Sequence, residues 1–295
     1  MSNNIKPPSP NFLIIIGNGF DRYHGLPTTY RDFHDWLVRR GKDEFIHNME
    51  EIFNYKDSSG HFSLWHDFET ALRKYDLNRL YTLRHTPNPD AIGQEVEQEA
   101  KDTMQPTIAA IKPLMTEWIR TVELGDIQRK LPLPNNALYL TFNYTMTLEK
   151  VYGIPDNQIL HIHKSVEDKD VIVGCDRTEN RWNLEKNHYS DDEEHYKKGL
   201  VDVMNQLYKD GRLDSDKEFY EGLKKVEHIF VVGHSLSIID LRYFGEISLK
   251  APSAHWYISI YSKSDEMRFE EFKNRMAAVP EDHWHTFTFN QRVFL

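Results

Sequence analysis

The feature that most constrains the fold is an early apolar run that ends in a glycine turn. Residues 12–16 are rich in β-branched side chains and show no polar alternation. This pattern is typical of a strand buried on both faces of a parallel sheet. At Gly17-Asn18-Gly19 the backbone can bend sharply and approach a ligand closely. A strand, a glycine turn and a following helix together present backbone N–H groups to a phosphate.

The turn nevertheless departs from the dinucleotide fingerprint Gly-x-Gly-x-x-Gly. Arg22 occupies the third glycine position, and residues 24–27 are expected to separate the turn from the next helix. No second strand with an acidic ribose ligand follows about 20 residues later, as the fingerprint requires. These departures argue against an ordinary NAD-dependent dehydrogenase. They leave open a tight turn that binds no ligand.

Composition and charge narrow the class of protein. The 295 residues are enough for one large α/β domain or two small ones. A formal net charge of -10 argues against a broad nucleic-acid-binding face, although a nucleotide can still bind in a local pocket. The single cysteine, Cys175, excludes a disulfide framework and a four-cysteine zinc ribbon. The lack of disulfides fits a reducing cytosol, so a cytoplasmic location is expected.

Membrane association is not expected. Residues 1–10 are polar, contain two adjacent prolines and are interpreted as a disordered lead-in rather than a signal peptide. No apolar stretch approaches the roughly 18 residues that a membrane-spanning helix needs.

Strand-like and helix-like segments alternate along most of the chain. This alternation predicts an α/β fold with a Rossmann-like, mostly parallel sheet of about six strands and right-handed crossovers. A large helical insertion is expected after the first strand, and a smaller one before the strand that ends at Gly233. The predicted strands are residues 12–16, 137–142, 158–163, 228–232, 254–261 and 283–289, with 170–174 as a further candidate.

The predicted domains follow from this arrangement. Residues 11–42 and 131–295 form the α/β domain, residues 43–130 the first insertion, and residues 176–226 a second, charged and helical insertion. Within the first insertion, helices are expected over residues 43–55, 64–75 and 91–123. Pro106 and Pro113 should end or kink the last of these.

Polar residues gather where the predicted strands end. In an open α/β sheet the carboxyl ends of the strands line one crevice, where ligands bind. Residues far apart in sequence should therefore meet in one site. The residues concerned are Gly17, Asn18, Gly19, Phe20, Asp21, Asn143, Tyr144, His163, Gly233, His234, Ser235 and Ser262.

These residue types suit cleavage of an N-glycosidic bond, which should pass through an oxocarbenium-like state. Asn143 could orient water or ribose hydroxyls, and His163 could act as a base or bind the ribose. The glycine turn at residues 17–19 and the helix after Gly233 could bind two phosphates through backbone N–H groups. Asp21 could serve a ribose or a nicotinamide amide.

Other interpretations remain open for the same residues. An asparagine after a strand is often a turn residue. His161 and His163 should share one face of their strand, as a packed structural pair or half of a metal site. No third ligand has diagnostic spacing, so no metal is predicted.

A serine hydrolase is a different possibility. Residues 232–237 approach the nucleophile elbow around Ser235, and Asp265 and then His283 or His285 follow in the order Ser, Asp, His. Against it, Ser237 replaces the last glycine of the elbow, and the glycine turn at residue 17 would have no role.

Several motifs together resemble a known family. Leu-Ile-Ile-Ile-Gly-Asn-Gly-Phe-Asp over residues 13–21, Trp-His-Asp-Phe-Glu over 65–69, Phe-Asn-Tyr-Thr over 142–145 with Leu148-Glu149, Ile162-His163, and Gly-His-Ser-Leu-Ser over 233–237 resemble the AbiH family of bacteriophage abortive-infection proteins. Further motifs of the same resemblance are His-Gly-Leu-Pro-Thr over 24–28 and Asp240. The motifs span nearly the whole chain.

AbiH proteins in turn look similar to the sirtuin-like superfamily of NAD-binding and NAD-hydrolysing proteins. That resemblance implies a phosphate-binding loop at residues 17–21, a catalytic Asn143 and His163, and a second nucleotide loop at residues 233–235. The chain departs from sirtuins in lacking the zinc ribbon. It also carries Lys164 in place of a glycine and Thr145 in place of an aspartate that helps bind nicotinamide.

The expected function is a cytosolic anti-phage effector that hydrolyses NAD or a related nucleotide and requires no further cofactor. Its expected partner is a small-molecule nucleotide, with a homo-oligomer or a phage-derived trigger left open. A nucleotide sensor or assembly module without catalysis is the alternative. The serine hydrolase is the third possibility.

Overall fold

The computed structural model describes residues 11–54, 64–86, 88, 90–169, 171–175, 190–208 and 216–289. The chain divides into two compact units. The first, here called the sheet unit, comprises Met1–Thr28, Ile119–Lys169 and Gly211–Leu295. The second, here called the helical unit, comprises Thr29–Trp118 and Asp170–Asp210. The predicted lead-in over residues 1–10 lies outside the described residues.

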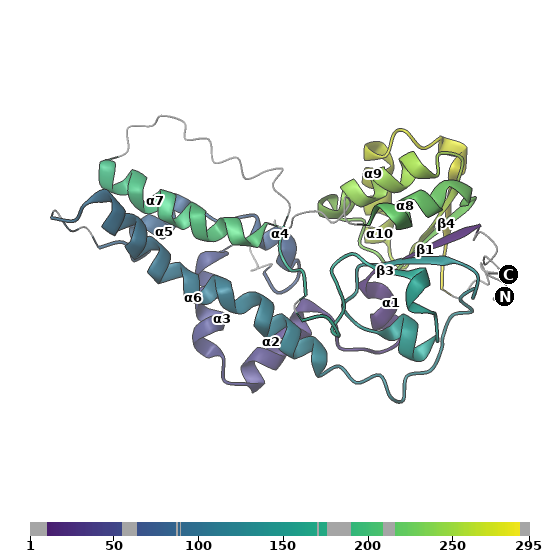
Figure 1. Ribbon diagram of the computed structural model, residues 1–295, viewed down its shortest axis with the longest axis horizontal. Helices are drawn as coiled ribbons and strands as arrows, with labels where there is room; N and C mark the ends of the chain where they lie inside the picture. Colours follow the sequence, from purple (N-terminus) through teal and green to yellow (C-terminus); the bar gives the residue numbers. More distant parts are fainter. Residues whose placement is uncertain are drawn as a thin grey trace, which may run out of the picture. The chain divides into compact units, whose positions relative to one another are not determined.

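The sheet unit contains six parallel strands in the order β3-β2-β1-β4-β5-β6 (Figure 1). This confirms the predicted α/β class and its parallel sheet. Ile14 of β1 lies opposite Tyr139 of β2 on one side and Phe230 of β4 on the other. The order reverses direction between β1 and β4, which is the topological switch point where open α/β sheets bind ligands. The strands are β1 Phe12–Ile16, β2 Leu138–Thr141, β3 Ile159–His161, β4 His228–Val232, β5 His255–Ser259 and β6 Trp284–Phe287.

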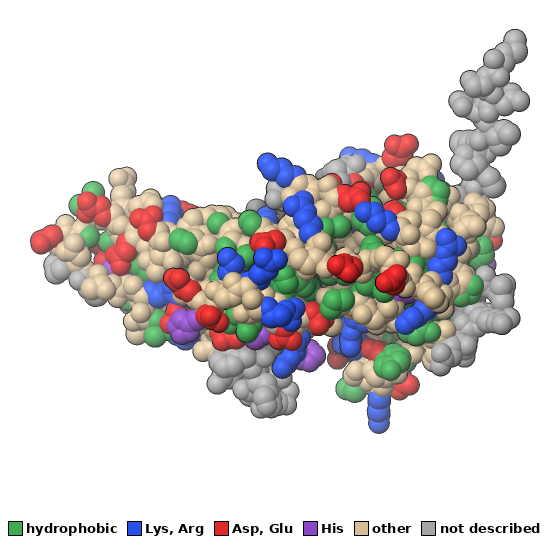
Figure 2. Space-filling model, turned by 90° about the horizontal axis from the view of Figure 1, so that it is seen from below, with side chains coloured by type: hydrophobic (Ala, Val, Ile, Leu, Met, Phe, Trp, Pro, Cys, Tyr) green, Lys and Arg blue, Asp and Glu red, His purple; other side chains and the backbone are tan. Residues whose placement is uncertain are grey.

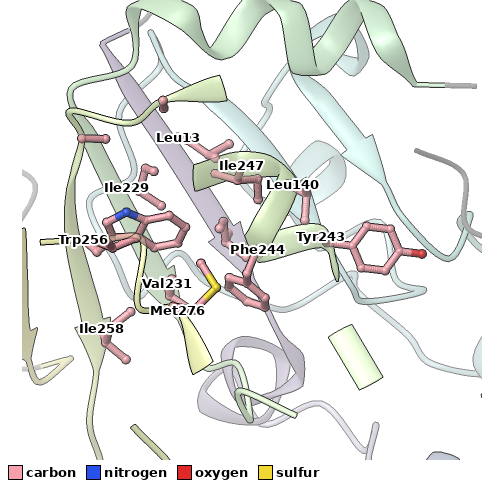
Figure 3. Packing of buried hydrophobic residues seen from close by; sticks show 14 of the residues in the cluster. Leu13, Leu140, Ile229, Val231, Tyr243, Phe244, Ile247, Trp256, Ile258 and Met276 are labelled. Atoms are coloured by element: carbon pink, nitrogen blue, oxygen red, sulfur yellow. The ribbon is translucent and has the colours of Figure 1, made fainter. Parts of the chain in front are cut away.

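Both faces of this sheet are buried, as the uninterrupted apolar run of β1 predicts. Leu13 and Ile15 point to one face, where they pack with Tyr243, Phe244 and other residues of the covering helices (Figure 3). Figure 1 shows helices α8, α9 and α10 on this side. These helices span Lys217–Gly222, Leu241–Lys250 and Lys263–Arg275.

The opposite face of the sheet is covered by shorter elements. Ile14 and Ile16 pack there with Phe20 of helix α1 (Asn18–Tyr23) and Leu148 of the π-helix η1 (Thr147–Val151). Each such fully buried aliphatic side chain contributes about 1.5–3 kcal/mol to the free energy of folding. Short 3₁₀ turns connect the remaining segments of the chain: η2 Asp156–Gln158, η3 Asn205–Leu207, η4 Leu223–Lys225, η5 Ile238–Asp240 and η6 Glu281–His283.

The helical unit contains the large insertion predicted after β1. Its first helix begins with a capping box, in which Thr29 Oγ1 accepts from the Asp32 N–H and the Thr29 N–H donates to Asp32 Oδ2. Further along, Gly199 of α7 lies against the backbone of α6, because a Cβ there would be only 2.4 Å from the Glu97 carbonyl oxygen. The helices are α2 Tyr30–Arg39, α3 Asp43–Ile52, α4 Phe68–Leu72, α5 Leu77–Arg84, α6 Gly93–Arg120 and α7 Asp191–Met204.

The structure differs from two expectations about local structure, a helix end at Pro106 or Pro113 and a strand near residues 170–174. Helix α6 continues through Pro106 and Pro113. Both prolines are exposed. Asp102 and Ala109 lie four residues before them and are exposed as well, and their carbonyl groups lack the N–H donor that a residue other than proline would supply. Water can pair such carbonyls, so a proline does not break the helix there. Residues 171–174 form no strand, and the neighbouring Cys175 makes only an isolated bridge with Tyr208.

Among the described residues, no helix is both long enough and apolar enough to cross a membrane. On the face drawn in Figure 2, Lys and Arg side chains lie among Asp and Glu side chains.

A cluster of histidines lies at the amino ends of β4, β5 and β6. His255 stacks on His283 with ring centroids 4.4 Å apart, and its Nδ1 is 3.0 Å from His285 Nε2. Tyr257 stacks on His285 and also approaches His228. One nitrogen of the His255–His285 pair must donate and the other must accept. The hydrogen bond therefore exists only while at least one of the two rings is neutral.

This cluster should make the sheet unit sensitive to acid. Burial, together with the positive charges of the neighbouring histidines, lowers the pKa of His285 against the opposing effect of Asp282. The unfolded chain then takes up a proton that the folded state resists, so the free energy of unfolding should fall as pH drops below about 6.5. Denaturant unfolding at pH 7.5 and 5.5 should show a smaller fall for His285→Gln than for the wild type. Thr286→Gln on the same strand should keep the wild-type fall, and an unchanged fall in His285→Gln would contradict this assignment.

Candidate active site at the carboxyl edge of the sheet

The loops after β1 and β4 meet at the switch point. The Gly17 N–H donates to the Val232 carbonyl at 3.0 Å, and the Gly19 N–H donates to the Gly233 carbonyl at 2.7 Å. Helix α1 begins at Asn18, directly after the N-cap residue Gly17. Residues 24–27 do separate the turn from helix α2, as expected, but a six-residue helix that was not expected, α1, already starts within the turn.

The glycines of these loops are required by the approach of the two backbones. A Cβ on Gly17 would lie 2.5 Å from His234 Cα, and one on Gly19 would lie 2.7 Å from the Gly233 oxygen. Gly233 itself has φ of 66°, in the left-handed region. The sequence interpretation assigned residues 17 and 19 to a close approach to a ligand. The approach in the structure is to the neighbouring loop, and both of their N–H groups already donate to carbonyls.

Asn143 joins the end of β2 to the glycine loop. Its Nδ2 donates to the Gly17 carbonyl at 3.2 Å, and its backbone N–H donates to Thr141 Oγ1 at 3.0 Å. The preceding residue, Phe142, donates its N–H to the Ile16 carbonyl at 2.9 Å. Asn143 is 7% exposed, so its carboxamide is held inside the edge rather than on a free turn.

Asp21 is a buried carboxylate in the same region. The hydroxyl of Thr145 donates to Oδ2 at 2.6 Å and that of Thr147 donates to Oδ1 at 2.9 Å. Burial raises the pKa of Asp21 to about 6, although hydrogen bonds from Thr145, Thr147 and Asn143 and the charge of His161 lower it in part. A carboxyl group that titrates near neutrality in a buried position is a common feature of functional sites.

His161 and Glu149 form a second polar pair next to Asn143. His161 Nε2 lies 2.7 Å from Glu149 Oε1, and Nδ1 lies 3.3 Å from the Asn143 carbonyl oxygen. The strand β3 ends at His161, so the prediction that His161 and His163 share one strand was wrong. His163 lies two residues beyond the end of the strand.

His163 is packed among aromatic rings. Its ring centroid is 5.6 Å from that of Phe142 and 6.0 Å from that of Tyr144, and the residue is 4% exposed. Phe142 also contacts the ring of His234 edge to face, with the two ring centroids 4.4 Å apart. His234 Nδ1 accepts the Leu236 N–H, so Nε2 carries the proton and faces Asp240 Oδ2 at 3.4 Å.

The remaining predicted residues have mainly local partners. Asn18 is exposed and exchanges hydrogen bonds with Thr28. Phe20 lies in the core beneath the sheet. Ser262 caps helix α10 in a capping box with Asp265. These contacts neither assign nor exclude a ligand, so the role of these three residues in a nucleotide site stays a prediction.

The serine-hydrolase triad is not assembled. The strand pairing places His283 level with His228, which is the first residue of β4. Ser235, in contrast, comes after Val232, the last residue of β4. Four strand residues span about 13 Å, so His283 lies at the opposite end of the strands from Ser235. His285 is level with Phe230 in the middle of β4 and lies two strands away from it. Asp265 is engaged by Ser262 and Arg268. The possibility of a hydrolase that uses Ser235 with these partners was therefore wrong.

A groove of about 560 Å³ lies further along the carboxyl edge, between β6 and α10. None of the predicted site residues lines it. Its lining includes Ile260, Lys263, Phe269 and Phe287. Among the residues that the structure describes, no group of three or more His, Cys, Asp or Glu side chains is arranged to hold a metal ion.

Sequence reasoning assigned no supporting role to the residues that hold the site together. Thr145, Thr147 and Glu149 follow Asn143 at intervals of two, a spacing that could have indicated a polar face. Ser259 was missed as well, although its Oγ accepts the Gly233 N–H at 2.8 Å. Ser259 is the last residue of β5 and so follows the same rule of strand-end placement.

Comparison with known proteins gives one family. The family model described as bacteriophage abortive infection AbiH matches residues 13–260. The chain belongs to this family. It is therefore an abortive-infection, anti-phage protein, and the match covers both loops at the switch point together with Asn143 and His163. A search among curated proteins finds no match.

The close approach of the two loops can be tested with this AbiH protein by adding single methyl groups. Gly19→Ala should lower the free energy of unfolding by about 1–3 kcal/mol, because its Cβ would overlap the Gly233 backbone. Gly245→Ala is the matched control, since nothing lies within 4 Å of its Cβ in helix α9. That change should raise the free energy by about 0.5–1 kcal/mol. Urea unfolding measures both, and a wild-type value for Gly19→Ala would disprove the packing argument.

The buried carboxyl group of Asp21 should cost stability at neutral pH. Its folded pKa of about 6 exceeds the usual value of 3.8, so the stabilising contribution is present at low pH and is lost as pH rises through 6. At 1.4 kcal/mol per pKa unit, Asp21→Asn should recover up to about 3 kcal/mol at pH 8.

Asp265→Asn provides the opposite case. Burial raises the pKa of Asp265, but hydrogen bonds from Ser262, Arg268 and the backbone lower it more, so its net pKa is reduced. That variant should lose stability at pH 8. Urea unfolding at pH 5 and 8 measures the change in the free energy of unfolding for both variants. A lower free energy of unfolding for Asp21→Asn at pH 8 would contradict the raised pKa of Asp21.

Proposed function

We propose that this AbiH protein acts in abortive infection by binding NAD, or a related nucleotide, at the carboxyl edge of its sheet and hydrolysing the N-glycosidic bond. The observation that carries the proposal is the strand order β3-β2-β1-β4-β5-β6. This order is the one on which dinucleotides bind at the reversal point. Here the glycine loops that follow β1 and β4 meet at that point, and the Asn143 side chain donates a hydrogen bond to the loop after β1.

The electrostatics of the edge support an acid–base reaction. Asp21, the Glu149–His161 pair and the His234–Asp240 pair all lie at the ends of β1 to β4 and are largely buried. Buried ionisable groups are costly to keep and concentrate where chemistry needs them. The sheet core itself is apolar and does not require them.

In the proposed reaction, water oxygen bonds to the ribose C1′ as the bond from C1′ to the nicotinamide nitrogen breaks. Nicotinamide leaves with the bonding electron pair and becomes neutral, and the water releases one proton. Asn143 would orient the water or the ribose hydroxyls, and His163 would accept a proton or bind the ribose. Loss of NAD would deprive the infected cell of its hydride carrier, and thereby stop phage growth.

One observation favours the non-catalytic alternative. Asn143, which would orient water or ribose hydroxyls, uses its Nδ2 for the Gly17 carbonyl. A catalytic group that is already engaged suits a nucleotide sensor or an assembly module, in which a phage-derived trigger or self-association follows binding. The two functions differ in turnover but not in binding.

Nucleotide pools of expressing cells separate these functions. During phage infection, cells with the wild type should lose NAD and accumulate ADP-ribose and nicotinamide, as measured by mass spectrometry. Asn143→Ala and His163→Ala should reduce this loss by at least about 100-fold, the scale on which general acid–base groups contribute. Asn54→Ala, in the helical unit, is the matched control and should deplete NAD like the wild type. Infected cells that arrest with constant NAD would contradict hydrolysis, and tight NAD binding by the purified protein without turnover would then support the sensor.

A further inference from the structure

The π-helix η1 carries an unusual buried carboxylate. The Glu149 side chain is 10% exposed, and within the described part of the chain a single one of its carboxyl oxygens has a hydrogen-bond partner. Oε1 contacts His161, whereas Oε2 is buried and has no hydrogen-bond partner among the described residues. A buried acceptor without a donor is costly and calls for an explanation.

Both ring nitrogens of His161 face a polar group. Nδ1 faces the Asn143 carbonyl oxygen, which can only accept, so Nδ1 carries a proton. Nε2 faces Glu149 Oε1 at 2.7 Å, a distance at which one further proton must lie between the two atoms. Because one ring nitrogen faces the Asn143 carbonyl and the other faces the Glu149 carboxyl group, the orientation of the His161 ring is fixed from both sides.

The Glu149–His161 pair contacts Asn143, the predicted catalytic residue. From Glu149 the contacts run through His161 to the Asn143 carbonyl, and from the Asn143 side chain to the Gly17 carbonyl. The same π-helix holds Asp21 through Thr147. The peptide and the carboxamide of Asn143 are therefore held from two sides, by the π-helix and by the glycine loop.

We propose that Glu149 and His161 are positioning residues that set the orientation of the Asn143 carboxamide for nucleotide turnover. This inference rests on the proposed function and adds two residues to it. Neither residue is assigned contact with the nucleotide, because both side chains are largely buried. Their effect is transmitted through the peptide of Asn143, where a displacement of about 1 Å can reduce a rate on the order of 100-fold.

Two histidine replacements test the direction of the effect. An asparagine at position 161 places an amide donor near the position of Nδ1, and a glutamine places one near Nε2. His161→Asn should therefore keep the bond to the Asn143 carbonyl and retain more activity than His161→Gln. A role in packing alone would favour the larger glutamine, so the reverse order of activities would overturn the proposal.

Glu149→Gln removes the charge and keeps the shape. Its kcat should fall at least about tenfold with little change in KM, and the side-chain amide signals of Asn143 in a ¹⁵N–¹H spectrum should shift. Loss of these signals in Asn143→Ala assigns them. Glu167→Gln is the matched control, because Glu167 is exposed and pairs with Lys150 of the same π-helix. This control should leave kcat and the Asn143 signals unchanged.

The two readouts distinguish this inference from the proposed function. If the wild type does not turn over NAD but Glu149→Gln still shifts the Asn143 signals, positioning stands and hydrolysis fails. If the wild type is active and Glu149→Gln changes neither kcat nor the Asn143 signals, the positioning role is wrong while hydrolysis stands.

Discussion

The backbone of the β1 loop touches the backbone of the β4 loop at the point where the sheet order reverses, and the rest of the candidate site depends on this contact. It is possible only because Gly17, Gly19 and Gly233 have no Cβ atoms. The contact fixes the start of helix α1, since Gly17 is its N-cap residue. Helix α1 in turn places Asp21 beneath Thr145 and Thr147, and the Gly17 carbonyl receives the side chain of Asn143.

The polar groups that surround this contact are not what an α/β core needs for stability. Asp21 is buried with a raised pKa, and Glu149 keeps one oxygen without a donor among the described residues. Apolar residues of similar size would avoid both costs. Proteins tolerate such costs mainly where function depends on them, so the edge is a more plausible centre of activity than either face of the sheet. Membership of the AbiH family gives this site its biological setting, which is abortive infection.

Much of the fold could be predicted because the strands of a parallel sheet are read from short apolar runs. Residues 12–16 and 228–232 were placed with their observed bounds, and the large helical insertion after β1 was expected. Helix α1 was missed because its six residues, Asn-Gly-Phe-Asp-Arg-Tyr, contain weak helix formers and follow a glycine. Helix α6 was expected to end or kink at Pro106 and Pro113. It does not end there, because both prolines lie on its exposed side, where water can replace the missing hydrogen bond.

The sequence alone determined that polar residues follow the buried strands. Since parallel strands share one carboxyl edge, it also determined that Asn143 and the two glycine loops belong to the same edge. Only the tertiary structure decided what each residue contacts there. The glycines proved to admit a neighbouring loop, and His161 proved to pair with Glu149 across a π turn. Such partners depend on differences of a few tenths of an ångström in the positions of separate segments, and these positions are set by the packing of the whole sheet rather than by local sequence.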